Sequence, residues 1–442
     1  MAAAPGERAR TQRTIIASGL AALVLLAVGV SAVHKQVRDG NDFPIYWQAA
    51  RALLSGQSPY DVGSGLHGYV YLPWFALLLG PLALLPLAGA AACWYAINVA
   101  FLWLAGRALL DTIGMVAAVP RARVLVLATL PFAGLLHDNL VLGQANLLLL
   151  LLVAATAQGA LRPRGNGAHG MALGLATALK MPAGLVLLPL LLRGHTRAIL
   201  GCLLGATLAL ALPFITTGAP FGGRLLGEWQ QKVVAPAAAG TLQGSKIIDQ
   251  SPHAALRRLL VDEPAYSGHA VNVAALDPVG FARVSRTAAA VLFAGYLLVW
   301  FAAPARGTRR ALALDLALGC CAMVQVTGFS LKAQFVVLLL PAWLAATLAW
   351  NERARTARIL LMGAGVLFLV SQPGVSGRPL SNLLLAYSAM TFGTLLLTTA
   401  VVVLRFATRN EPARAREECS RRTITPPPSG GRTGAPGAGT TR

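Results

Sequence analysis

The sequence predicts an all-α, polytopic integral membrane protein. Hydrophobic residues make up 56% of the 442 residues and charged residues only 12%. Long runs of Leu, Ala and Val recur along the chain, and a soluble protein of this size could not solvate so much apolar surface. The alternating ten-residue strands of a membrane barrel are absent. We therefore expect about ten to twelve membrane helices.

The positive charge is distributed in a way that indicates membrane topology. The formal net charge is +21, but the arginines fall in short clusters between apolar runs. Such clusters are typical of cytoplasmic loops, so nucleic acid is not an expected partner. Some of these side chains are expected to contact anionic membrane lipids. The five cysteines form no CxxC pair, so neither a disulfide framework nor a thiolate metal site is expected.

The first apolar run, residues 15–33, follows three arginines and is long enough to cross a membrane. No clear small-residue cleavage site follows it, so we expect a retained helix with residues 1–13 in the cytoplasm. Residues 14–406 then form a single transmembrane catalytic domain. Residues 407–442 are rich in Arg, Pro and Gly, and we expect a disordered cytoplasmic tail there.

Further apolar runs alternate with basic clusters, which the positive-inside rule assigns to the cytoplasm. This rule places two long segments outside: a first outer loop with juxtamembrane helices, 34–72, and a long second outer loop, 217–283. The turn at 330–332 falls outside as well. The apolar runs are 71–88, 89–110, 123–136, 140–160, 170–192, 197–216, 286–303, 309–328, 333–350, 358–373 and 381–405.

If every apolar run crossed the membrane once, some basic clusters in the first half of the chain would lie outside the cell. The clusters all stay in the cytoplasm if two of the runs do not cross the membrane as single helices. Run 71–88 contains three prolines, so we expect it to lie in or dip into the outer leaflet. Run 170–192 contains Lys180 and Pro182 near its middle, so we expect a short hairpin with its tip at this lysine. Non-helical backbone at that depth requires surrounding protein or water.

Aspartates lie among aromatic residues and prolines in the first outer loop. A carboxylate held against a membrane surface is a functional candidate, so we expect Asp42 to act as a general base. Asp42 also precedes the helical stretch 45–54 and can cap it, a role compatible with catalysis. Asp61 follows Pro59 and Tyr60, and it can either close a turn or take part in the chemistry.

A polar island separates two apolar runs. It contains His137, Asp138 and Asn139, followed by Gln144 and Asn146. Five hydrogen-bonding residues this close to lipid need partners. The pattern fits either a polar turn between two helices or a site for sugar hydroxyls, and the sequence leaves both interpretations open.

Lysine is rare in this chain, with five residues against 32 arginines. Lys180 and Lys332 lie between apolar flanks on the predicted outer side. A lysine there either snorkels to lipid headgroups or meets an anion such as a phosphate.

The second outer loop contains another candidate phosphate site. Asp249 and Gln250 lead into a short predicted helix that carries Arg257 and Arg258, and a helix N-terminus with arginines suits a phosphate. No Walker motif, dinucleotide fingerprint, HExxH sequence or nucleophile elbow is present. Nucleotide-sugar binding by a soluble fold is therefore disfavoured.

Six short motifs follow one another on the predicted outer face. They are Asp42-Phe43-x-x-Tyr46, Gly56-Gln57-Ser58-Pro59-Tyr60-Asp61, Tyr69-Val70-Tyr71-Leu72-Pro73, Gly143-Gln144-Ala145-Asn146, Leu179-Lys180-Met181-Pro182, and Asp249-Gln250-Ser251 with Arg257 and Arg258. In this order the motifs resemble those of glycosyltransferase family 87, the polyprenyl-phosphate-sugar-dependent transferases. The resemblance covers residues 40–345.

The resemblance implies the GT-C fold and a lipid-phosphate-linked sugar donor, often of mannose. It gives Asp42 the place of the family's first-loop catalytic aspartate. The chain departs from the family at Asp249, where asparagine is usual, and at Gln334, where the family often has histidine. The residues expected to bind substrate are Tyr46, Tyr60, Asp61, Tyr71, His137, Asp138, Asn139, Gln144, Asn146, Lys180, Asp249, Gln250, Arg257, Arg258, Lys332 and Gln334.

We expect an inverting displacement at the anomeric carbon of a polyprenyl-phosphate sugar, with Asp42 removing a proton from a glycolipid or glycan acceptor. The departing phosphate needs charge stabilisation, which Lys332, Lys180 or the Arg257–Arg258 pair could supply. The scheme requires no metal and no cofactor. Two alternatives remain open. One is a lipid-linked-sugar flippase or solute transporter, whose key charges should lie near the midplane; the other is a catalytically silent subunit.

Overall fold

The computed structural model describes residues 5–39, 42–63, 68–118, 122–162, 167–238, 247–266, 269–302 and 307–407. Within these ranges every regular element is a helix, apart from two isolated bridges, Asp249 with Leu331 and Tyr266 with His269. The predicted all-α fold class is therefore confirmed. The predicted tail lies, from residue 408 onward, outside the described residues.

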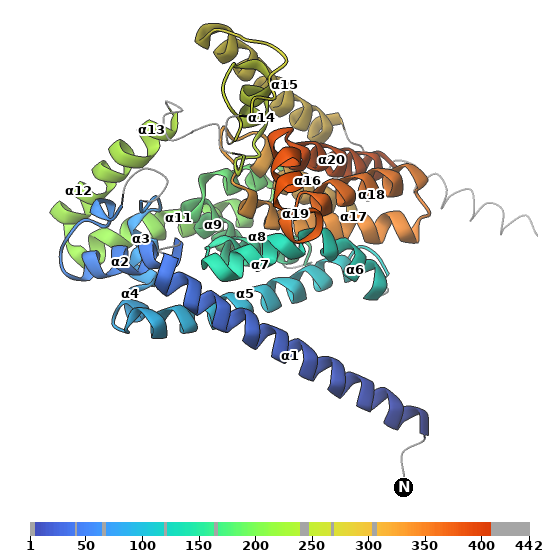
Figure 1. Cartoon of the computed structure of the whole chain (residues 1–442), viewed down its shortest axis with the longest axis horizontal. Helices are drawn as coiled ribbons and strands as arrows, with labels where there is room; N and C mark the ends of the chain where they lie inside the picture. The colour runs from blue at the N-terminus through green and yellow to red at the C-terminus, as the bar shows by residue number, and fades with distance from the viewer. Residues whose placement is uncertain are drawn as a thin grey trace, which may run out of the picture.

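The helices form one bundle with short helices at its margins (Figure 1). The first half of the chain contains α1 (Pro5–Asp39), α2 (Asp42–Leu54), η1 (Pro59–Asp61), α3 (Pro73–Leu78), α4 (Gly80–Ala83), α5 (Leu87–Gly114), α6 (Ala122–Thr129), η3 (Leu130–Phe132), α7 (Ala133–Leu142), α8 (Asn146–Ala160), α9 (Gly167–Leu179), η4 (Met181–Val186), α10 (Leu187–Leu192) and α11 (Thr196–Thr217). The second half contains α12 (Ala219–Trp229), η5 (Gln230–Val234), α13 (Ala235–Ala238), α14 (Pro252–Leu260), α15 (Pro278–Ala302), α16 (Arg309–Gln325), η6 (Lys332–Leu338), α17 (Leu339–Asn351), α18 (Arg355–Val370), α19 (Pro373–Ala386) and α20 (Ala389–Ala407). In Figure 1, α1 is the long blue helix that runs along one side of the bundle and projects beyond it.

Several helices of the described chain are long and apolar enough to cross a membrane. They are Leu87–Gly114, Ala122–Leu142, Thr196–Thr217, Pro278–Ala302, Lys332–Asn351 and Ala389–Ala407. A seventh is added if α18 and α19, which are bent by 87° at their junction, count as one span. Two shorter apolar segments, Asn146–Ala160 and Met181–Leu192, accompany these helices. The chain is a polytopic membrane protein, and the total of ten to twelve spans remains a prediction.

Run 71–88 does not form a membrane-crossing helix. It is divided into α3 and α4, which have six and four residues, because prolines interrupt it at three places. Pro73 begins α3, Pro81 lies in the first turn of α4, and Pro86 caps α5. A six-residue helix is about 9 Å long, far short of the roughly 30 Å hydrocarbon core of a bilayer.

The run 170–192 folds into the predicted hairpin. Helices α9 and α11 run in the same direction. This follows from their contacts, which advance together along both helices: Gly170 lies against Ala198, and Gly174 lies against Cys202 and Ala206. Residues 181–192 must therefore return the chain to the end from which α9 started. Lys180 has extended backbone dihedrals at the reversal, and Pro182 starts η4.

The bundle has two chemically different ends. At one end, which we call the site end, the side chains of Gln144, Asn146 and Lys180 meet those of α2 and α7. At the opposite end, Arg193 and Arg405 both bind Asp315, with Arg405 Nε 2.8 Å from Oδ1. A buried carboxylate shared by two arginines ties α10, α16 and α20 together there.

The hairpin predicts that its tip and the opposite end lie on different sides of the membrane. With the chain's own five cysteines replaced, we expect Met181→Cys to react with a membrane-impermeant thiol reagent in intact cells, since Met181 is 54% exposed. Val273→Cys in the second outer loop should label equally well, and Thr196→Cys should label only after permeabilisation. Met181→Cys behaving like Thr196→Cys, with both reactive in detergent, would contradict the hairpin orientation.

Candidate active site

Asp42 is the first residue of α2. The helix it begins matches the predicted stretch 45–54. The carboxylate is half-buried, and its Oδ2 accepts a hydrogen bond of 2.8 Å from Gln144 Nε2. A charged acceptor held by an amide donor keeps a defined orientation.

The polar island forms a connected network around this carboxylate. Asn146 Nδ2 donates to Gln144 Oε1 at 2.6 Å and to Asn139 Oδ1 at 2.9 Å. Lys180 Nζ, at the tip of the hairpin, donates to Asn146 Oδ1 at 2.7 Å. Asn139 in turn donates to the backbone oxygen of Ala333 at 2.9 Å. Segments from three distant parts of the sequence are thus connected to Asp42, as buried polar groups require.

The turn between α7 and α8 is shaped by a glycine. Gly143 caps α7 with a φ of 68°, a left-handed conformation that favours glycine. A Cβ at this position would approach the Cβ of Phe43 to 2.6 Å. The Gly143 carbonyl accepts a 2.7 Å hydrogen bond from the indole of Trp94, whose ring stacks on Phe43 with centroids 5.8 Å apart. The turn that carries Gln144 is therefore packed directly against the start of α2.

Buried tyrosines form the wall beside Asp42. The hydroxyls of Tyr46 and Tyr71 lie 3.1 Å apart, and the Tyr60 hydroxyl donates to the backbone oxygen of Tyr71 at 2.9 Å. Burial raises the pKa of both Tyr46 and Tyr71, and the negative charge of Asp42 adds to each shift. These phenols remain protonated and can donate hydrogen bonds.

Lys332 is paired with a carboxylate. Its ammonium lies 3.0 Å from Oδ2 of Asp138, and its side chain is only 14% exposed. The other oxygen of Asp138 lies 3.6 Å from Nδ1 of the exposed His137. As predicted, Lys332 begins a helix, here the 3-10 segment η6.

The segment predicted to form the second outer loop is held against the segment that carries Lys332. Asp249 Oδ1 accepts hydrogen bonds from the backbone N–H groups of Ser330 at 3.0 Å and Ser251 at 2.9 Å. The backbone N–H of Lys332 donates to the carbonyl of Ile248 at 2.7 Å. The buried Asp249 therefore positions this segment by hydrogen bonding to its backbone.

The predicted phosphate-binding arginines have protein partners. Arg258 is 1% exposed and donates to the backbone oxygens of Asp249 and Ala386 and to the Ser388 hydroxyl. Burial lowers the pKa of Arg258 to about 10, with Asp249 opposing the shift. Arg257 forms a two-point ion pair with Glu263. The predicted short helix is present as α14, with Ser251 as its N-cap and both arginines in its last turn.

The remaining predicted residues lie further from this network or have other partners. Gln250 is fully buried and donates to the carbonyls of Ile247 and Leu385. Asp61 is 68% exposed and pairs with Lys232 at 2.7 Å. Gln334 is half-buried in η6. The structure brings together Asp42, Tyr46, Tyr71, Asn139, Gln144, Asn146 and Lys180, and joins Lys332 to Asp138.

Sequence reasoning missed two residues that shape this site. Trp94 lies within the apolar run 89–110, where no sequence motif singled it out. Gln36 is buried on α1 and donates to the carbonyl of Val141 at 3.2 Å, so it fixes α1 against α7. Within the described ranges, no three His, Cys, Asp or Glu side chains are grouped in a way that could hold a metal ion.

Comparison with known proteins identifies the family. The family model of glycosyltransferase family 87 matches residues 69–328, which is more than half of the chain, and the chain belongs to this family. No curated protein and no solved structure matches it. The protein is therefore a membrane-embedded enzyme that transfers a sugar. The matched region includes the Gln144 network and the hairpin, whereas Asp42 precedes it.

The Gly143 turn provides a test of the packing beneath Asp42. We expect Gly143→Ala to destabilise the protein by about 1–3 kcal/mol or more, because a left-handed alanine is strained and its Cβ meets Phe43. Thermal unfolding of the purified protein in detergent would measure this loss. Gly106→Ala on α5, where no atom lies within 4 Å of the added Cβ, is the matched control. Equal melting temperatures for the two variants would rule out the close packing.

Proposed function

We propose that this glycosyltransferase moves a hexose, which we take to be mannose, from a polyprenyl-phosphate donor to a lipid or glycan acceptor, with inversion at the anomeric carbon. The observation that carries the proposal is the orientation of the half-buried Asp42 carboxylate by Gln144. A carboxylate held at the mouth of an apolar bundle has the acceptor geometry that a general base requires.

In this mechanism Asp42 removes the proton from the acceptor hydroxyl as the oxygen attacks the anomeric carbon. The bond from that carbon to the donor phosphate breaks, and polyprenyl phosphate leaves with the electron pair. For inversion, the base and the leaving group lie on opposite faces of the sugar. The neutral hydroxyls of Tyr46 and Tyr71 are suited to hold sugar hydroxyls, and the buried amides of Asn139 and Asn146 hold Gln144 and Lys180 in place.

Lys180 is the predicted cation most closely coupled to the base. It connects to Asp42 through Asn146 and Gln144, and the two charges attract each other. Positive charge at this position would stabilise the Asp42 carboxylate before it accepts the proton. The ammonium of Lys332 is already paired with Asp138, so we assign Lys332 to holding η6 beside α7.

The site end is proposed to face the outside of the cell membrane, with both termini in the cytoplasm. The support is the charge distribution, because Arg193 and Arg405 lie together at the opposite end. A transporter or flippase is disfavoured by the family and by the position of Asp42 and Lys180 at one end of the bundle. A catalytically silent subunit would show no sugar transfer in the activity measurements described below.

Asp42→Asn should lower sugar transfer by about 10²–10⁴-fold without unfolding the protein. Asparagine keeps an oxygen that can accept from Gln144, and it remains a good capping residue. Transfer would be measured in membranes with radiolabelled polyprenyl-phosphate mannose at saturating concentration, and melting temperature would report folding.

Asp61→Asn is the matched control for that variant. Its carboxylate is exposed and paired only with surface side chains among the described residues, so near-parental transfer is expected. Full activity in Asp42→Asn together with loss in Asp61→Asn would move the base to Asp61.

If Lys332 and Asp138 act as a pair, the effects of substituting them on sugar transfer should not be additive. Lys332→Met and Asp138→Asn should reduce transfer to a similar degree, and the double variant should be no worse than either single change. Lys232→Met, which breaks an exposed pair, should have little effect. A raised donor KM in Lys332→Met with no defect in Asp138→Asn would instead show that Lys332 binds the donor phosphate.

A further inference from the structure

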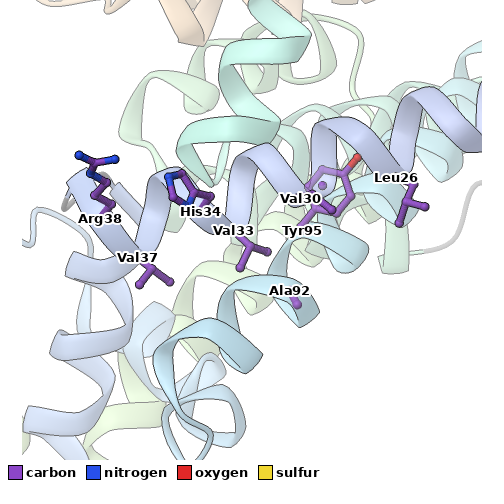
Figure 2. A pocket seen from close by; sticks show the side chains of 9 residues that line it. Leu26, Val30, Val33, His34, Val37, Arg38, Ala92 and Tyr95 are labelled. Carbon is purple, nitrogen blue, oxygen red and sulfur yellow. The ribbon is translucent and has the colours of Figure 1, made fainter.

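A groove lies between the C-terminal half of α1 and the first turns of α5, with a volume of about 880 Å³ (Figure 2). Its apolar wall is formed on α1 by Leu26, Val30, Val33 and Val37 and on α5 by Ala92 and Tyr95. Tyr95 fixes one side, because its hydroxyl donates to the Leu25 carbonyl at 2.6 Å. Its ring can lie this close to α1 because residue 29 is a glycine, where a Cβ would come within 2.8 Å of the ring.

The two ends of the groove differ in charge. Leu26 lies at one end of the row, and His34 and Arg38 lie toward α2 at the other (Figure 2). Both polar side chains are exposed, and neither has an ion-pair partner in the part of the chain that the structure describes. An apolar channel that ends at an arginine complements a lipid whose tail ends at an anion.

The other candidate cations are already engaged. Lys332 is paired with Asp138, Arg257 with Glu263, and Arg258 with buried backbone oxygens. Arg38 is therefore better placed to receive an added phosphate than any of these three.

The groove also ends close to the base. Arg38 precedes Asp42 by four residues, so their Cα atoms can be separated by at most about 14 Å. The sugar attached to a phosphate at Arg38 could therefore reach Asp42, the first residue of α2.

We propose that this groove holds the prenyl chain of the donor, with the donor phosphate against Arg38 and His34 and the sugar directed toward Asp42. The inference rests on the proposed function for the identity of the donor. A polyprenyl phosphate fits better than a two-chain phospholipid, because a single branched chain leads directly into its phosphate. Apolar burial along the groove supplies affinity, and the arginine fixes the depth of the chain.

Photo-crosslinking tests the site without requiring turnover. The probe is a polyprenyl phosphate that carries a diazirine in its prenyl chain, added to the full-length protein in phosphatidylcholine nanodiscs. We expect adducts on α1 between residues 26 and 38 and on α5 at residues 92–95. Adducts that map elsewhere would overturn the proposal.

Matched variants separate the groove from general membrane effects. Ala92→Trp fills the groove and should abolish labelling, whereas Ala100→Trp, also exposed on α5, should not. Arg38→Gln should raise the half-saturating probe concentration by about tenfold, as expected for one lost charge-assisted contact. Arg38→Lys should recover part of the affinity, and Arg51→Gln, an exposed arginine packed on Trp47, should match the parent.

Competition decides the class of lipid. Unlabelled polyprenyl phosphate should displace the probe, and phosphatidylglycerol at the same concentration should not. Equal displacement would mean that the groove takes any anionic membrane lipid, which overturns the donor assignment. Groove labelling in a protein that transfers no sugar would refute the proposed function alone, whereas transfer without groove labelling would refute this site alone.

Discussion

The hydrogen bond from Gln144 to Asp42 is the interaction on which the site depends. It joins the start of α2 to the α7–α8 turn, two segments 102 residues apart, and it exists only because Gly143 allows that turn to pack against Phe43. Trp94 supports the arrangement from α5 by bonding the Gly143 carbonyl and stacking on Phe43. The proposed catalytic carboxylate needs such support, because water would otherwise compete for its orientation.

The arrangement of charge follows from the cost of polar groups near lipid. At the site end, amides and one lysine satisfy one another in a chain from Asp42 to Lys180. At the opposite end, Asp315 is shared between Arg193 and Arg405, which holds three helices in register. Placing different chemistry at the two ends lets the apolar middle of the bundle serve as scaffold alone.

Much of the fold could be predicted from local signals. Proline positions predicted the break of run 71–88 and the reversal at Lys180, and the stretch 45–54 was predicted as a helix, which in the structure begins at Asp42. Long-range pairing could not be predicted, because nothing local indicates that Asn139 meets the backbone of Ala333 or that Lys332 meets Asp138. The burial of Arg258 could not be predicted either, because a sequence shows charge but not burial; its donors bind backbone oxygens and the Ser388 hydroxyl.

The most direct test of the central claim is a structure with a non-transferable polyprenyl-phosphate sugar bound. Our account predicts that the anomeric carbon faces the Asp42 carboxylate with room for one acceptor hydroxyl between them. It also predicts that the phosphate lies on the far side of the sugar from that carboxylate. A sugar bound beside Asp61 or Glu263, with Asp42 directed away from the anomeric carbon, would contradict the account.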